Sequence, residues 1–264
     1  MGISSYVIIP NMTYILDEQS VISADLDGTL TESKSPMTVE MASAISLWLV
    51  NHRFAIISGG EHIQFEKQVV SRFPEDTNFK NLFLFPINGS ACYVFKNDAW
   101  QAVYNEKLSE DEQNTIAEAI EEAVVKSGVI IETKHGNQLS FRGGQVTFSA
   151  LGQEAPLSEK APWDPDQAKR KIIVSHLTPL LPNFTISMGG TTSIDVTKKG
   201  IDKAYAIEKM KVLLNVDNEH VLFLGDALFP GGNDYPAERT GVNYIKVSGP
   251  EESIKIIQEN ISKI

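Results

Sequence analysis

Residues 21–30 read VISADLDGTL, and this stretch decides the fold. Its first half is a short, mostly apolar run that ends in acidic and glycine residues. Such a run is typical of a buried parallel strand whose carboxyl end meets a loop. Asp25 and Asp27 therefore stand at a strand end, which is where open α/β sheets place their ligand sites.

The pattern of strand followed by helix continues on both sides of this stretch. Apolar periodicity and capping residues predict helices over 38–52, 61–73 and 202–214, and strands over 54–58, 82–87, 220–226 and 243–247, with a closing helix after them. Strands that alternate with helices indicate a parallel sheet covered on both faces. The sequence thus predicts an α/β fold with a doubly wound parallel sheet, a Rossmann-like core.

Between residues 88 and 188 the pattern changes, because strands without intervening helices dominate. Ser109 and Glu112 form a capping box for one helix, and a Gly-Gly pair at 143–144 separates two alternating segments. We therefore expect a discontinuous core of residues 1–87 and 189–264, interrupted by an inserted α+β domain over 88–188. An insertion of that length is close to the usual size of a domain.

The composition excludes several classes of function. The 264 residues carry 34 acidic and 23 basic side chains, a net charge of -11, which disfavours binding to nucleic acid or to an anionic membrane surface. An anionic ligand must then be held by local cations.

The single cysteine, Cys92, excludes an internal disulfide and fits a reducing compartment. No apolar stretch is long enough to span a membrane. We expect a cytoplasmic protein.

Paired carboxylates are the strongest chemical signal. Of two aspartates separated by one residue, one can attack phosphorus while the other handles a proton. A polar turn after a strand would explain D-x-D alone, but not the longer pattern D-x-D-G-T-L. Downstream, GDALFPGGND places Asp226 and Asp234 at and after another strand end. Four such carboxylates would repel a phosphate unless a cation intervened, so we expect Mg2+ bound through Asp25, Asp27, Asp226 and Asp234.

These motifs resemble those of the haloacid dehalogenase superfamily of aspartate-nucleophile phosphotransferases. The insertion resembles the C2-type α+β cap of subclass IIB, and the wider pattern is similar to the eukaryotic-type α-phosphomannomutases. That similarity rests on DLDGTLT (25–31), FEK (65–67), ING (87–89), FRGG (141–144), GGTTSIDV (189–196), GIDK (200–203) and GDALFPGGND (225–234).

The resemblance implies a role for each matching residue of the core. Asp25 matches the nucleophile, and Asp27 matches the general acid/base that also offers its backbone carbonyl to the metal. Asp226 matches the metal-binding aspartate, whereas Asp234 matches either a ligand or a residue that orients a bound water. Ser58, with Gly59 beside it, matches the phosphate-binding motif after the second strand, and Lys203 matches the lysine that neutralises the phosphoaspartate. Without the other motifs, Ser58 and Lys203 would read equally well as a turn hydroxyl and a solvated lysine.

The resemblance also implies which residues bind the substrate. Arg142 matches an arginine that grips a substrate phosphate, and Lys34 of the core stands where the mutases have another. Ser193 and Asp195 match residues that hold sugar hydroxyls. Because they are two apart on a strand they face the same side, although an exposed strand face would look the same.

Two departures from the mutase pattern bear on the reaction. Gln153 and Lys160 stand at or near positions where that pattern has arginines, and Ser58 stands where the mutases have V-G-G-S. Losing two guanidinium groups weakens the cationic clamp that a mutase needs. We therefore rank a magnesium-dependent phosphohydrolase of a sugar phosphate, or a similar small phosphorylated metabolite, above a phosphohexomutase that interconverts hexose 1- and 6-phosphates. A third function that the sequence allows is that of a catalytically silent binding protein on this fold. The sequence also allows a homodimer.

Overall fold

A computed structural model of the chain describes residues 16–33, 35–132 and 134–263. Contacts between residues divide the chain into two compact units. The core unit comprises Met1–Tyr104 and Lys203–Ile264, and the inserted unit comprises Asn105–Asp202. Lys34 lies outside the described residues, so its expected phosphate contact stays a prediction.

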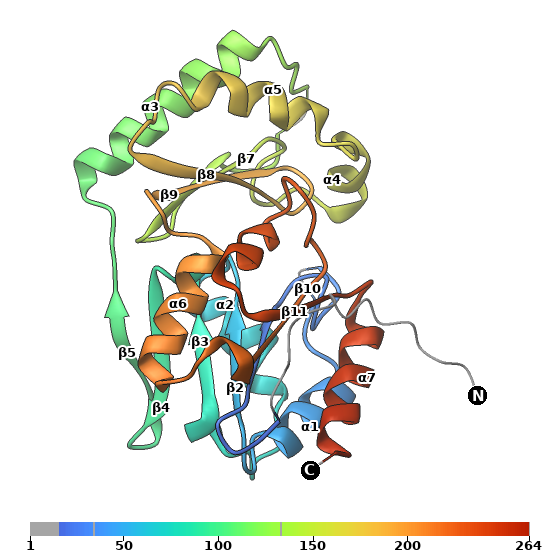
Figure 1. The fold of residues 1–264 in the computed structure, drawn as a ribbon. Helices are drawn as coiled ribbons and strands as arrows, with labels where there is room; N and C mark the ends of the chain where they lie inside the picture. The colour runs from blue at the N-terminus through green and yellow to red at the C-terminus, as the bar shows by residue number, and fades with distance from the viewer. Residues whose placement is uncertain (1–15, 34, 133, 264) are drawn as a thin grey trace. The chain divides into compact units, whose positions relative to one another are not determined.

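The core unit is built on a seven-stranded sheet with the strand order β11-β10-β1-β2-β3-β4-β5 (Figure 1). Strands β11, β10, β1, β2 and β3 run parallel, and β4 runs antiparallel to β3. The predicted α/β class is confirmed. The elements of this unit are β1 (Val21–Asp25), α1 (Val39–Trp48), β2 (Arg53–Ile57), α2 (His62–Gln68), β3 (Leu82–Phe85), β4 (Ala91–Lys96), β5 (Ala99–Asn105), α6 (Lys203–Leu214), β10 (Val221–Gly225), β11 (Asn243–Lys246) and α7 (Pro250–Ile261), with 3-10 turns at Val70–Arg72, Phe79–Asn81, Ile87–Gly89, Asn218–His220 and Tyr235–Thr240.

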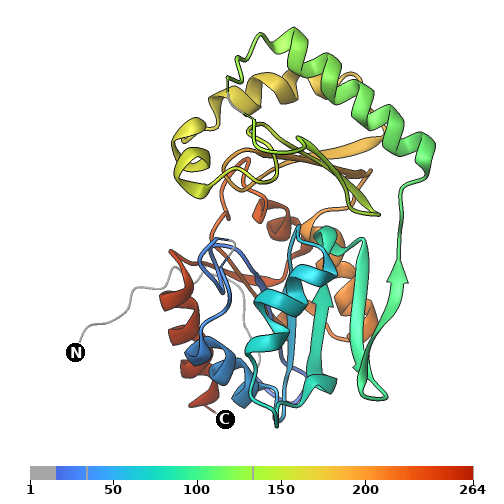
Figure 2. The same ribbon diagram turned by 180° about the vertical axis from the view of Figure 1, so that it is seen from behind.

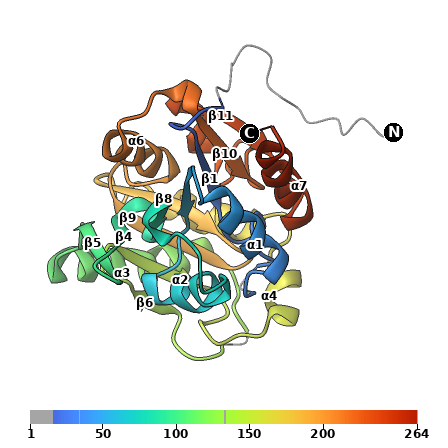
Figure 3. The same cartoon turned by 90° about the horizontal axis from the view of Figure 1, so that it is seen from below.

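Helices cover both faces of the core sheet, as a parallel sheet requires. Residues of α1, α2 and α7 pack with Ile22 and Leu224 on one face, and α6 packs with Val21 and Phe223 on the other (Figure 3). Strand β1 lies inside the sheet and every one of its residues is buried. The carboxyl end of β1 is therefore held rigidly between β2 and β10.

The inserted unit packs helices on one face of a four-stranded antiparallel sheet with the order β6-β7-β9-β8 (Figure 2). Val146 and Ile194 of the sheet pack against α3 and α5, and Ser109 caps α3 through the predicted capping box. The alternate residues Thr147 and Asp195 face the opposite side. The elements of this unit are α3 (Glu110–Ser127), β6 (Leu139–Phe141), β7 (Gln145–Ser149), α4 (Leu157–Trp163), α5 (Ala168–Leu177), β8 (Phe184–Gly189) and β9 (Ser193–Lys198).

The boundaries between the units differ from the expected 87/88 and 188/189. Strands β4 and β5 extend the core sheet instead of starting the insertion, because β4 pairs with the edge of β3. The Tyr104 hydroxyl also donates a hydrogen bond of 2.9 Å to the carbonyl oxygen of Gly89. Strand β9, assigned to the core from the sequence, pairs with β7 and β8 in the inserted sheet. Sequence periodicity does not reveal strand partners, so it does not locate these boundaries.

None of the helices within the described ranges has the length and apolar character that a membrane-spanning segment needs.

The thiol of Cys92 is buried, and burial raises its pKa to about 12, which disfavours a reactive thiolate.

Candidate active site

The carboxyl ends of three neighbouring strands bring the predicted core residues together. Asp25 ends β1, Ser58 directly follows β2, and Asp226 directly follows β10. Strand β1 pairs in parallel with both β2 and β10, so these three ends lie at the same edge of the sheet. Positions far apart in the sequence thus become neighbours.

Lys203 lies at the centre of this group, at the first position of α6. Its ammonium donates a short hydrogen bond to Oδ1 of Asp25 and another of 2.8 Å to the carbonyl oxygen of Ile57. Lys203 Nζ also lies 3.1 Å from Asp234 Oδ1. Lys203 is 1% exposed and Asp234 is fully buried. A buried ammonium beside a carboxylate at a strand end can offset negative charge that develops on a transferring group.

The carboxylates outnumber this ammonium, and their pKa values reflect it. Burial, followed by the nearby carboxylates of Asp234 and Asp226, raises the pKa of Asp25 well above its usual value despite Lys203. Burial and Asp234 likewise raise the pKa of Asp226. Burial alone would lower the pKa of Lys203, but Asp234 and Asp25 together outweigh it and raise that pKa. The cluster therefore carries surplus negative charge.

The same residues fit a divalent cation. One oxygen from each of Asp25, Asp226 and Asp234 lies within 4.8 Å of the others. Carboxylate oxygens in such a group are the ligands that Mg2+ prefers, and a cation among them would remove the surplus charge. The carboxylate of Asp27 is not part of this group. The backbone carbonyl of Asp27 is therefore its expected contact with the metal, as the resemblance implies.

The loop after β1 holds Asp226 in place. Gly28 has a φ of +90°, and a Cβ added there would lie 2.8 Å from Asp226 Oδ2. Thr29 Oγ1 accepts a hydrogen bond of 3.0 Å from the backbone amide of Asp226 and donates one of 3.3 Å to its Oδ1. The residue that it supports is 197 positions away, so no local pattern could have revealed it.

Asp234 is fixed by the loop that follows β10. Its Oδ2 accepts a hydrogen bond of 3.0 Å from the backbone amide of Ala227. A Cβ on Gly225 would lie 2.7 Å from the same oxygen, so only glycine leaves room for Asp234 there. This arrangement explains the glycine in G-D-A-L, and it leaves Oδ1 of Asp234 directed at Lys203.

Ser58 and Gly59 open the loop after β2. Ser58 is 4% exposed and its Oγ accepts a hydrogen bond of 3.2 Å from the amide of Gly60. The hydroxyl retains a proton to donate. Gly59 is partly exposed. Ser58 therefore has the position expected of it, whereas the phosphate contacts of both residues stay predictions.

The expected substrate residues of the inserted unit are connected to two polar networks. Arg142 donates hydrogen bonds of 3.4 Å to Ser140 Oγ and to Gln153 Oε1. Lys160 is 4% exposed and donates a hydrogen bond of 3.1 Å to the carbonyl oxygen of Gln153. An amide thus lies beside Arg142 where the resemblance implies a second guanidinium.

The second network surrounds Asp195. Thr147 Oγ1 donates a hydrogen bond of 2.7 Å to Asp195 Oδ1 and accepts one of 2.8 Å from Gln145 Nε2. Ser193 lies two residues before Asp195 on β9, and both side chains belong to the face that does not pack against α3 and α5. Thr147 and Gln145 carry no sequence signal of these contacts, because their alternation with apolar residues predicts only a half-buried strand.

Comparison with known proteins identifies the family. A model of the eukaryotic phosphomannomutases matches residues 50–263. This chain belongs to that family. Among similar proteins are phosphomannomutases of Encephalitozoon cuniculi (26% identical over 254 residues, covering 94% of this chain and 96% of the relative) and Spinacia oleracea (28% over 241 residues, 88% and 91%), and phosphomannomutase 1 of Homo sapiens (24% over 247 residues, 89% and 89%). The expected resemblance to the phosphomannomutases is confirmed, and the chain is an enzyme of the phosphotransferase type.

Solved structures confirm the haloacid dehalogenase fold. An IMP-nucleotidase of Plasmodium falciparum has a TM-score of 0.69 at 17% identity, covering 93% of this chain and 68% of that one. The protein SMU.1108c of Streptococcus mutans has a TM-score of 0.62 at 17% identity, covering 92% and 99%. At these identities the likeness bears on fold alone. The carboxylates of Asp25 and Asp226 stand at the carboxyl ends of strands, which is where open α/β sheets bind their ligands.

Proposed function

We propose that this phosphomannomutase-family chain is a magnesium-dependent phosphohexomutase that interconverts hexose 1- and 6-phosphates. The observation that carries the proposal is the position of Asp25, held at the end of β1 by Lys203 and grouped with Asp226 and Asp234. The family match extends over most of the chain, including the inserted unit. The match to the phosphomannomutase family supports mutase activity over the hydrolysis that the sequence favoured.

In the proposed reaction, an Asp25 carboxylate oxygen attacks phosphorus, the O–P bond forms, and the ester P–O bond breaks. Asp27 donates a proton to the departing sugar oxygen and later removes one from the hydroxyl that attacks the phosphoaspartate. Lys203 offsets the charge that develops on the transferring group. Mg2+, held by Asp25, Asp226, Asp234 and the Asp27 carbonyl, would supply further positive charge.

The sugar hydroxyls in this proposal are bound by Ser193 and Asp195, and the distal phosphate by Arg142 and Lys34. In a mutase the phosphoaspartate transfers its phosphoryl group to the free hydroxyl of a hexose monophosphate, and the resulting bisphosphate returns its other phosphoryl group to Asp25. A hexose bisphosphate is therefore both activator and intermediate. The enzyme must hold a phosphate away from Asp25 while the sugar reorients. A weakened clamp would let the sugar leave and water attack instead.

One observation favours hydrolysis as a second candidate function. Gln153 presents an amide to Arg142, and Lys160 is buried against the Gln153 carbonyl. Arg142 is thereby left without a neighbouring guanidinium at position 153 for bidentate binding of phosphate. In this second candidate the substrate is the same class of sugar phosphate, and water accepts the phosphoryl group from Asp25.

The two reactions are separated by one experiment. The purified chain with Mg2+ and a catalytic amount of glucose 1,6-bisphosphate is given mannose 1-phosphate, and both mannose 6-phosphate and inorganic phosphate are measured over time. We expect mannose 6-phosphate to exceed released phosphate. Release of phosphate without mannose 6-phosphate would replace the mutase proposal with hydrolysis. Asp25→Asn serves as the control for contaminating activity in either assay.

A further inference from the structure

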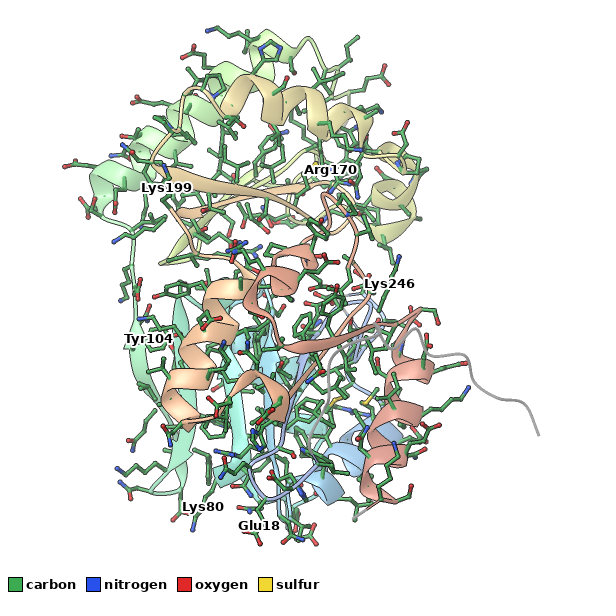
Figure 4. The ribbon with its side chains drawn as sticks, viewed as in Figure 1. Glu18, Lys80, Tyr104, Arg170, Lys199 and Lys246 are labelled. Atoms are coloured by element: carbon green, nitrogen blue, oxygen red, sulfur yellow. The ribbon has the colours of Figure 1, made fainter. Side chains whose placement is uncertain are left out.

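A buried arginine of the inserted unit supports the turn before Ser193. Arg170 lies on α5 and is 2% exposed (Figure 4). Its Nε donates a hydrogen bond of 2.7 Å to Asp164 Oδ2. The Asp164 carboxylate also accepts hydrogen bonds of 2.9 Å and 3.2 Å from the backbone amides of Lys169 and Arg170. Asp164 therefore binds the first turn of α5 and fixes the direction of the guanidinium.

The other side of the guanidinium reaches the chain between β8 and β9. Arg170 Nη1 donates to the carbonyl oxygens of Gly189 at 3.1 Å and Gly190 at 2.9 Å, and lies 3.5 Å from that of Ser193. These carbonyl contacts are additional to the ion pair between Arg170 and Asp164. Because the guanidinium presents a rigid set of donors, several carbonyls converging on it hold the turn in a single conformation.

This turn borders the residues expected to bind sugar hydroxyls. A Cβ on Gly189 would lie 2.7 Å from Asp195 Oδ2, so the backbone at the end of β8 packs closely against that carboxylate. Thr147 holds the other oxygen of Asp195 from β7. A shift of the turn would therefore move Ser193 directly and press on Asp195.

We propose that Arg170 is a positioning residue for sugar recognition, acting through the β8–β9 turn on Ser193 and Asp195. The inference rests on the proposed function, in which these two residues bind the hydroxyls of a hexose phosphate. It adds a buried residue that does not itself touch the substrate. Its effect is confined to substrates that carry sugar hydroxyls, because the phosphoryl chemistry resides at Asp25 in the core unit.

The test compares two substrates. Arg170→Lys keeps a positive charge but cannot bond Asp164 and three carbonyls together. We expect KM for the hexose phosphate to rise about tenfold in this variant. The value of kcat/KM for p-nitrophenyl phosphate, an ester without sugar hydroxyls, is expected to stay within about twofold of the wild type. Asp164→Asn, which leaves Arg170 in place, gives a second variant that should change KM in the same direction.

Ile173→Val is the matched control. Ile173 lies on the same helix, is fully buried in the core of the inserted unit, and loses one methyl group without a change at the turn. We expect this variant to lower the melting temperature and leave both substrates unaffected. If Arg170→Lys lowers the melting temperature but leaves KM for the hexose phosphate unchanged, or affects both substrates equally, the role of Arg170 is structural and the inference is wrong.

Failure of the proposed function is recognised separately. If the wild-type chain acts on p-nitrophenyl phosphate but on no hexose phosphate, the substrate proposal fails and a measurement without substrate decides the rest. We then expect the backbone amides of residues 190–193 to exchange with solvent about tenfold faster in Arg170→Lys than in Ile173→Val. Equal exchange in the two variants would overturn the inference about the turn.

Discussion

Lys203 donates a hydrogen bond to the carboxylate of Asp25, although 178 positions separate the two residues in the chain. The insertion of the second unit accounts for most of this separation, because Lys203 is the first residue of the core unit after it. The chain thus leaves the core, folds a separate unit, and returns at the residue that neutralises the expected nucleophile.

Replacing Asp25 tests the nucleophile. Asp25→Asn keeps the size of the side chain and an oxygen for Lys203 but cannot form the phosphoaspartate. We expect phosphoryl transfer to fall by at least about 10³-fold, with an unchanged circular dichroism spectrum. Full activity of Asp25→Asn on every substrate would exclude the proposed mechanism.

Replacing Lys203 tests the ion pairs of the cluster. Lys203→Met should destabilise the chain by about 3–5 kcal/mol, because it leaves Asp25 and Asp234 buried without their ammonium.

The surplus of buried carboxylates predicts how stability changes with pH. A carboxyl group whose pKa is raised by folding contributes stability below its unfolded pKa and loses that contribution as the pH rises through its folded pKa. Both Asp25 and Asp226 have raised pKa values. We therefore expect the metal-free chain to become less stable as the pH rises from about 4 toward neutrality, relative to the variant Asp226→Asn.

The same surplus predicts the effect of Mg2+. Because the cation competes with protons for the carboxylates, its affinity should increase with pH. Differential scanning calorimetry is expected to show a larger rise in melting temperature on adding Mg2+ at about pH 8 than at about pH 5. Asp226→Asn should reduce the rise at both values. An equal rise in the wild type at the two pH values would contradict the assignment of the metal to this group.

Gly28 offers a test of the loop that supports Asp226. In Gly28→Ala the new Cβ would lie 2.8 Å from Asp226 Oδ2 at a φ of +90°, so both the backbone and the carboxylate must move. We expect a loss of about 1–3 kcal/mol in the free energy of unfolding and weaker binding of Mg2+ by titration calorimetry. Gly143→Ala is the control, because it has a φ of +68° and only a distant neighbour. Equal Mg2+ affinity in the two variants would argue against support of Asp226 by this loop.

The choice between mutase and hydrolase activity should respond to position 153. Gln153→Arg would place a second guanidinium beside Arg142, whose Nη2 lies 3.4 Å from Gln153 Oε1. We expect the ratio of mannose 6-phosphate formed to phosphate released to rise by about tenfold, since a phosphate away from Asp25 would be held more tightly. Gln153→Glu should lower the ratio. Identical ratios in the two variants would mean that this position does not control the fate of the phosphoryl group.

The sequence by itself predicted the elements that depend on local patterns. VISADLDGTL identified β1 and its polar end, and the alternation of strands and helices predicted the parallel sheet, because strand burial and capping are encoded over a few residues. Parallel pairing then placed Asp25, Ser58 and Asp226 at one edge. The acidic loop after residues 220–226 indicated Asp234, and the family motifs supplied Lys203 and the substrate residues. The roles of all these residues in catalysis and substrate binding stay proposals.

Only the tertiary structure decided what depends on distant partners. It assigned β4 and β5 to the core sheet and β9 to the inserted sheet. The periodicity of a strand predicts its buried face but not the strand with which it pairs. It also joined Thr29 to Asp226, and Arg170 to the carbonyls before Ser193. A buried polar group must find a partner wherever the fold offers one, and that partner lies at no fixed spacing along the chain.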